Sequence, residues 1–161
     1  MARIPAPLDS VRWDGRSRGH VESFFLKAND PRAPHRALWL KFTLLVPRSA
    51  DQPALAEVWA VRFDGDTGQH KGSKSSFDVA TAELSREGLG IQVDRCVLLP
   101  GQTRGHVGQD GDLIRWDLTF DYEDQQPWMS LPSPWMYERG FPKNKTYSSC
   151  PATRFSGSLW V

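Results

Sequence analysis

The chain has few of the residues that cross-link small proteins or bind metals. It contains two cysteines, Cys96 and Cys150, and four histidines in 161 residues. The cysteines form no Cys-x-x-Cys pair, and no Cys/His spacing is typical of a zinc site. A disulfide between Cys96 and Cys150 stays open, but two separate buried thiols fit the sequence better. We therefore expect no metal and no cofactor.

Long hydrophobic runs are also missing. No stretch approaches the ~18 apolar residues that a membrane-spanning helix needs, and the N-terminal MARIPAPLDSVRWDG lacks the apolar segment of a signal peptide. These absences predict a cytoplasmic protein without a membrane span. No charge of one sign dominates either, because 20 basic and 19 acidic residues leave a net charge of +1. The basic residues are scattered along the sequence, so we expect no nucleic-acid partner.

Catalytic signature motifs are absent. The sequence has no GxSxG, no GxGxxG after a strand, no HExxH and no Walker loop. Of the four histidines, His35 and His70 fall in polar, turn-rich or solvated stretches, whereas His20 and His106 stand in strands beside charged neighbours. Nothing local orients an acid–base partner for any of them, so a structural or surface role is favoured over catalysis.

Strand patterns dominate the rest of the chain. The clearest lies in GDLIRWDLTFDY, residues 111–122, where apolar and polar residues alternate strictly from Ile114 onward. Because side chains of a strand point to opposite faces with a period of two, this segment predicts a half-buried strand. Its apolar face carries Ile114, Trp116, Leu118, Phe120 and Tyr122, and its polar face carries Arg115, Asp117, Thr119 and Asp121.

Further runs predict an all-β protein. Strands are expected at residues 20–28, 37–46, 57–64, 69–77, 91–99, 103–108 and 154–161. The continuous apolar run at 37–46 indicates burial on both faces, and 57–64 places Trp59, Val61 and Phe63 on one face. One short helix is expected at 78–86, with Asp78 as its N-cap and Gly88 as its stop. Residues 125–150 are too proline-rich for a central strand and predict a long, ordered crossing loop that covers a barrel mouth or edge.

Short strands separated by glycine-rich turns are typical of an antiparallel barrel or sandwich. We favour the barrel, because closure hides the edges of strands this apolar.

Two sets of charged residues are candidates for chemistry. Arg115 and Asp117 are either a solvated outer face, which we favour, or a polar lining for a ligand. Glu22 shares a strand face with Phe24, which favours an inward orientation and requires a partner. Arg104 and His106 share a face of their own strand, so a Glu22/Arg104/His106 cluster is a hypothesis of the sequence.

The order of several segments resembles a known family. These segments are HVESFFLKANDP, ALWLKFTLL, AEVWAVRFD, LPGQTRGHVGQDGDLIRWDL, FPKNKTYSSCP and RFSGSLWV. Together they are similar to the N-terminal half of the tandem lipocalin-like proteins, which include carotenoid hydratases (hydroxyneurosporene synthases), AttH-like proteins, stress-survival factors and some Diels–Alder cyclases. The resemblance covers residues 19–161 and rests on the order of weak motifs.

The resemblance implies a lipocalin-like (calycin) antiparallel β-barrel at residues 19–161 after an N-terminal extension at 1–18. A second barrel normally follows in this family, and catalytic residues of the hydratases lie mostly in that second half or between the barrels. Their chemistry is therefore not carried over to residues of this chain.

We predict that the barrel binds a hydrophobic small molecule of isoprenoid, polyketide or fatty-acyl type. The expected walls and polar contacts are Trp39, Trp59, Trp116, Phe120, Glu22, Arg104 and His106. One alternative is part of a lyase or cyclase acting through one acidic residue, Glu22 or Asp117. Another is a structural domain that forms an interface with a second lipocalin-like domain or a homodimer.

Overall fold

The protein is built of two antiparallel sheets. The computed structural model describes residues 9–122, 126–139 and 143–161. The first sheet contains β1 His20–Asn29, β2 Arg36–Val46, β3 Leu55–Asp64 and β4 Lys71–Asp78, in that spatial order. The second contains β5 Glu83–Leu84, β6 Ile91–Val93, β7 Cys96–Leu99, β8 Gln102–Val107, β9 Ile114–Phe120 and β12 Phe155–Trp160. Its spatial order is β12-β9-β8-β7-β6-β5.

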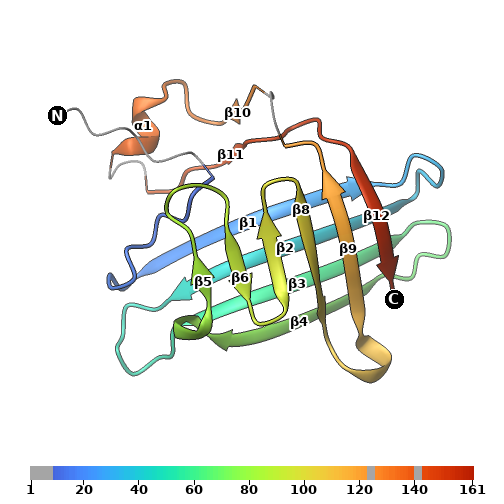
Figure 1. The fold of residues 1–161 in the computed structure, drawn as a ribbon, viewed down its shortest axis with the longest axis horizontal. Coiled ribbons are helices and arrows are strands. Elements are labelled where there is room, and N and C mark those ends of the chain that lie inside the picture. Colours follow the sequence, from blue (N-terminus) through green and yellow to red (C-terminus); the bar gives the residue numbers. More distant parts are fainter. Residues whose placement is uncertain (1–8, 123–125, 140–142) are drawn as a thin grey trace.

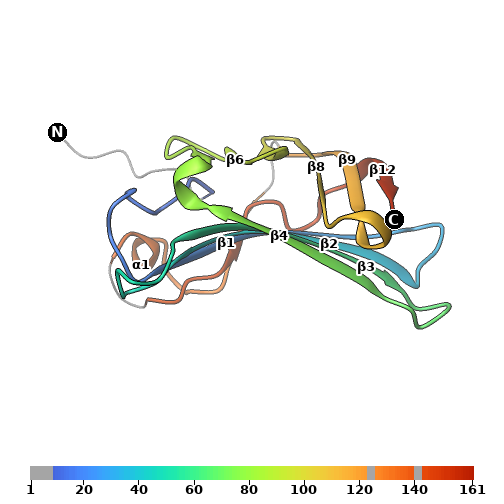
Figure 2. The same ribbon diagram turned by 90° about the horizontal axis from the view of Figure 1, so that it is seen from below.

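The sheets lie face to face as two layers. Their strands cross steeply, because β1 to β4 run along the long axis of the molecule and β6 to β9 run across it (Figures 1 and 2). The chain passes between the layers at the corner formed by the 3₁₀ turn η1 Val79–Thr81. The all-β antiparallel prediction is confirmed. No ladder joins the two sheets in the described part of the chain, so the expected closed barrel is not found there.

The core fills the space between the layers. Strand β9 has the predicted alternation, with Ile114, Trp116 and Leu118 buried and the residues between them exposed. Strand β2 contributes an inner face that is buried at Leu38, Leu40, Phe42, Leu44 and Val46. Its other face is only partly covered at Trp39, Lys41 and Leu45, so the prediction that 37–46 is buried on both sides is wrong. The reason is that only one layer packs against this sheet.

Two predicted elements are replaced by shorter ones. The helix expected at 78–86 is a single 3₁₀ turn followed by β5. Asp78 does cap that turn, since its side chain accepts a hydrogen bond from the N–H of Ala80 at 2.9 Å. The helix does not continue, because Leu84 pairs with Ile91 in the sheet, and tertiary pairing overrides a weak local propensity.

The strand expected at 91–99 is a hairpin of β6 and β7. Asp94 has a positive φ of 51° in the two-residue turn between them. Such left-handed turns match the twist of a hairpin, and aspartate tolerates this conformation.

The proline-rich segment contains short regular elements within an ordered crossing. It holds the short pair β10 Trp128–Met129 and β11 Tyr147–Ser148, and between them the short helix α1 Trp135–Glu138. The segment runs beside β1 at one end of the sandwich (Figures 1 and 2). Residue 125 and residues 140–142 of the predicted crossing lie outside the described residues. No helix in the described part of the chain is long and apolar enough to span a membrane.

Part of the predicted N-terminal extension belongs to the sandwich. Residues 1–8 lie outside the described residues, but Val11 is 2% exposed and is part of the core. Its backbone N–H donates to the carbonyl of Ser85 at 2.9 Å, which ties the N-terminal stretch to the second sheet. The sandwich therefore begins before residue 19.

The outer face of the first sheet is an aromatic and lysine surface. One register row across it contains Phe25, Lys41, Trp59 and Lys74 in β1 to β4. The Lys41 ammonium lies 5.3 Å from the Phe25 ring centroid, and that of Lys74 lies 4.8 Å from Trp59. Glu57 accepts hydrogen bonds here from Lys74 at 2.9 Å. These cation–π and ionic contacts stabilise the face of the first sheet that points away from the second sheet.

Acid should weaken the fold through Glu57. Burial opposes its ionisation, but hydrogen bonds from Lys74, Ser76 and Trp59 outweigh that effect and hold its pKa below the usual 4.5. Its stabilising contribution is therefore complete above pH 4.5 and decreases as the pH falls below that value. Urea unfolding between neutral and acidic pH should show a smaller loss of stability in Glu57→Gln than in the wild type. An unchanged pH dependence in the variant would contradict this assignment.

Candidate functional site

The two open sides of the sandwich each contain a cavity. The larger one, which we call the β1 groove, has a volume of about 1290 Å³ and extends along the edge strand β1. It is bounded by residues 19–27, 137–139 and 143–151, and by Leu89, Leu98 and Phe120. The proline-rich segment thus forms one wall, as expected of a crossing that covers an open edge.

The apolar wall of the groove comes from both sheets. Phe24 and Leu26 stand on the inner face of β1, and Leu98 and Phe120 face them from the second sheet. Phe120 packs against Phe155 with ring centroids 5.5 Å apart. The period-two pattern of β1 and β9 places these side chains inward, because each alternates with exposed residues. Together these side chains form a large apolar surface that an apolar ligand could contact.

Glu22 is the central polar group of the groove. The backbone N–H of Arg12 donates to both of its carboxylate oxygens, at 3.0 and 2.9 Å, and the N–H of Trp13 donates at 3.3 Å. The Nε2 atom of His20 lies 3.1 Å from the same carboxylate, whose side chain is 14% exposed. The predicted inward orientation of Glu22 is confirmed. Its partners are backbone N–H groups and His20 rather than Arg104.

Two tyrosines complete the polar end of the groove. The hydroxyl of Tyr122 donates to the carboxylate of Asp9, and burial together with this carboxylate raises the pKa of Tyr122 well above its usual value. Burial also raises the pKa of Tyr147 to about 12, although a hydrogen bond with the Arg12 side chain opposes the shift. Both phenols therefore keep their protons at neutral pH and remain hydrogen-bond donors.

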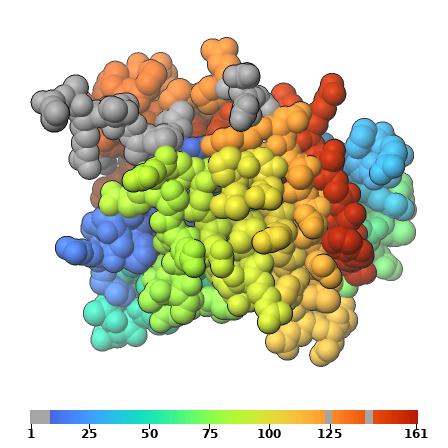
Figure 3. Space-filling view, viewed as in Figure 1, coloured from blue at the N-terminus to red at the C-terminus, as the bar shows by residue number. Residues whose placement is uncertain are grey.

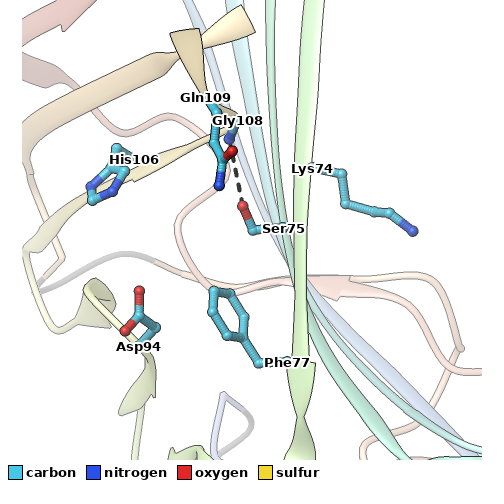
Figure 4. Close-up of a pocket in the computed structure, with 7 residues that line it drawn as sticks. All are labelled: Lys74, Ser75, Phe77, Asp94, His106, Gly108 and Gln109. Carbon is cyan, nitrogen blue, oxygen red and sulfur yellow. Dashed lines mark hydrogen bonds between the residues drawn. The ribbon is translucent and has the colours of Figure 1, made fainter.

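The second open side contains a smaller cavity of about 360 Å³ between β4 and β8. Ser75 and Phe77 extend into it from β4, while Lys74 points to the opposite side of the strand (Figure 4). The N–H of Gly108 donates to Ser75 Oγ at 3.5 Å, which links the sheets at this edge. Asp94 and His106 line its other side (Figure 4). Its few polar groups do not converge on one point.

Arg104 and His106 do not join Glu22. Both stand on the outer face of β8, where Arg104 is opposite Asp117 and His106 is opposite Arg115 of β9. This face forms a continuous surface across the second sheet (Figure 3). The predicted Glu22/Arg104/His106 cluster is wrong, because Arg104 and His106 point away from the first sheet. The buried side chains of β8, which point towards the first sheet, are those of Thr103 and Val107.

The tryptophans that were predicted to line the ligand site do not lie together. Trp39 and Trp59 stand on the outer face of the first sheet, whereas Trp116 is 1% exposed in the core and donates from Nε1 to Thr103 Oγ1 at 3.0 Å. The inner face of β3 carries the small residues Ala56, Val58 and Ala60 instead. The structure therefore places only Phe120 and Glu22 of the seven predicted site residues in the β1 groove.

The outer polar face of β9 is solvated. Arg115 and Asp117 are exposed, as the favoured interpretation of the sequence expects. Arg115 lies over the Trp160 ring, 5.1 Å from its centroid.

The two cysteines are separate thiols, as favoured, but only Cys96 of the two is buried. Cys96 is buried, and burial raises its pKa to about 11. Cys150 is partly buried at the groove, and burial raises its pKa as well. Neither thiol is in the environment that activates a nucleophilic cysteine.

Several groove residues were missed by sequence reasoning. His20 and Glu22 are two residues apart in one strand, so period-two counting was a usable signal for their contact. Asp9 and Arg12 carry no such signal because they lie outside any strand, and Tyr147 carries none because it lies in the short strand β11, far from β1 in sequence. Only folding brings them to the same end of the groove.

Comparisons with known proteins identify no relative. No family model matches the chain, and neither a curated protein nor a solved structure shows significant similarity to it. A function can therefore be proposed only from the structure of the groove.

Proposed function

We propose that the protein binds a hydrophobic small molecule of isoprenoid, polyketide or fatty-acyl type in the β1 groove. The observation that carries the proposal is a cavity of about 1290 Å³ that combines apolar walls with one polar end. Binding pockets for small molecules have this composition, with a few polar groups that orient a mostly apolar ligand. The lipocalin-like relationship, with or without a second barrel, remains part of this proposal.

The ligand's apolar part would lie between Phe24 and Leu26 on one side and Phe120 on the other. Glu22 and Tyr147 lie at the inner polar end of the groove and present an acceptor and a donor held in place by neighbouring groups. A catalytic role, the lyase or cyclase alternative, would fall to Glu22 rather than to Asp117, since Asp117 faces away from the groove. Preorganised polar groups favour binding because little ordering is needed when the ligand enters.

A fluorescent polyene fatty acid, cis-parinaric acid, tests the proposal. Wild-type protein should bind it and enhance its fluorescence, with one molecule retained per chain in native mass spectrometry. Phe120→Ala removes a ring from the groove wall and should weaken binding about tenfold, corresponding to about 1.4 kcal/mol of lost contact.

Trp59→Ala is the matched control, because Trp59 is an aromatic residue on the outer face of the first sheet. It should leave the affinity unchanged. Absence of binding by the wild type, or equal weakening by both variants, would contradict the groove as the binding site.

A further inference from the structure

The β1 groove concentrates positive charge in a chain that is nearly neutral. Among the described residues, six basic and three acidic residues line it, which gives this part of the groove a formal charge of +3. The whole chain has a net charge of +1. The basic residues are Arg12, Lys27, Arg48, Arg139, Lys143 and Lys145. A concave surface lined by one sign of charge raises the local concentration of ligands of the opposite sign.

Two of the three groove carboxylates are already hydrogen-bonded within the protein. Asp9 accepts from the Tyr122 hydroxyl, and Glu22 accepts from backbone N–H groups and lies beside His20. These contacts hold the carboxylates at the inner polar end. The remaining carboxylate, Glu138, is exposed on α1. The acidic groups are therefore poorly placed to neutralise the exposed basic residues of the groove, Lys27, Arg48 and Lys143, which we call its rim.

Three basic residues of the rim have no ion-pair partner among the described residues. Lys27, Arg48 and Lys143 are exposed, and no carboxylate of residues 9–122, 126–139 or 143–161 lies within 4.0 Å of their charged groups. Lys145 differs, because its ammonium donates to the backbone carbonyls of Tyr137 and Arg139. The three unpaired cations come from β1, from the turn after β2 and from the proline-rich segment, so the rim is basic on both of its sides.

We propose that the β1 groove selects an anionic amphiphile, a molecule with an apolar chain and a carboxylate or phosphate head group. This inference rests on the proposed function and names the class of its ligand. The chain packs against Phe24, Leu26 and Phe120, and the head group is attracted to the cations of the rim. Basic side chains at an exposed rim contribute modestly and in a salt-dependent way, so selectivity for the anion is strongest at low ionic strength.

The test compares cis-parinaric acid with its methyl ester, which has the same polyene chain and no charge. The wild type should bind the acid about fivefold more tightly than the ester at low salt, and the ratio should approach one at about 0.3 M salt as the charges are screened. Competition with farnesyl monophosphate and with oleate distinguishes a phosphate from a carboxylate head group.

Arg48→Gln/Lys143→Gln should bring the acid-to-ester ratio towards one without weakening the ester. For each single variant, binding is measured together with stability in urea. This separates an effect of the lost charge from an effect of unfolding. Arg115→Gln is the control, since it removes a cation from the outer face of the second sheet and should leave the ratio unchanged. Equal binding of acid and ester by the wild type would overturn the anionic preference while the proposed function stands. Failure to bind either compound would overturn both.

Discussion

Trp116→Ala is expected to destabilise the protein by about 3–5 kcal/mol, the usual cost of removing a large buried aromatic side chain. Trp116 is 1% exposed in the core between the two sheets, so its removal leaves a cavity that the surrounding structure fills only in part. Domains of this size have a total stability of about 5–15 kcal/mol. The variant should therefore lose a large share of its stability, measured by urea unfolding followed by circular dichroism.

The indole N–H adds a second, separable contribution. It donates to Thr103 Oγ1, which is itself buried and donates to the carbonyl of Val97 at 2.9 Å. Trp116→Phe keeps most of the apolar volume but removes this donor, so it should cost less, about 1–2 kcal/mol. Trp160→Ala is the control, because Trp160 is 48% exposed on the neighbouring strand and should cost under about 1 kcal/mol. A loss below about 1 kcal/mol in Trp116→Ala would show that the core is not built around this residue.

Glu22→Ala is expected to cost about 2–3 kcal/mol and to loosen the N-terminal stretch, because hydrogen bonds to a charged acceptor are among the stronger ones. The variant leaves the N–H groups of Arg12 and Trp13 without their acceptor and removes the partner of His20. Hydrogen exchange at residues 9–19 should increase more than elsewhere. Unfolding in urea measures the stability, and binding of cis-parinaric acid measures the effect on the groove.

Glu22→Gln separates charge from shape at the same position. The amide keeps one acceptor oxygen but presents an NH₂ group towards backbone donors, so it should be less stable than the wild type and more stable than Glu22→Ala. If the protein turns over a polyene, this variant should abolish turnover. Glu138→Gln is the matched control, since Glu138 also lines the groove but is exposed on α1. Unchanged stability, exchange and binding in Glu22→Ala would contradict the assigned role.

The strand content of the protein was predictable from local pattern. The alternation in β9 and the runs that form β1 and β3 correctly predicted which residues share a face, and a strand was also correctly expected where β4 lies. Such patterns are reliable because the period of side-chain direction along a strand is independent of what the strand packs against. The helix at 78–86 was predicted wrongly, since a good N-cap at Asp78 is a weaker determinant than sheet pairing of the residues that follow.

The sequence was a poorer guide to which face of each strand is buried in the core and which is exposed to solvent. In β9 the charged residues mark the outer face, so Trp116 was placed correctly inside although it proved to be core rather than ligand wall. In β3 both faces are largely apolar, and the face with Trp59, Val61 and Phe63 was expected to point inside. The structure buries Ala56, Val58 and Ala60 instead, because the crossing strands of the second sheet approach closely and leave room only for small side chains.

The sequence by itself thus determined an antiparallel all-β chain, the inward direction of Glu22 and Phe120, and the solvated face of Arg115 and Asp117. Only the tertiary structure decided that the sheets form an open sandwich in the described residues, with a groove at β1. It also decided that Asp9, Arg12 and Tyr147 meet Glu22 there. The physical reason is that strand periodicity is local, whereas the packing of layers and the gathering of charge at one rim depend on contacts between distant segments.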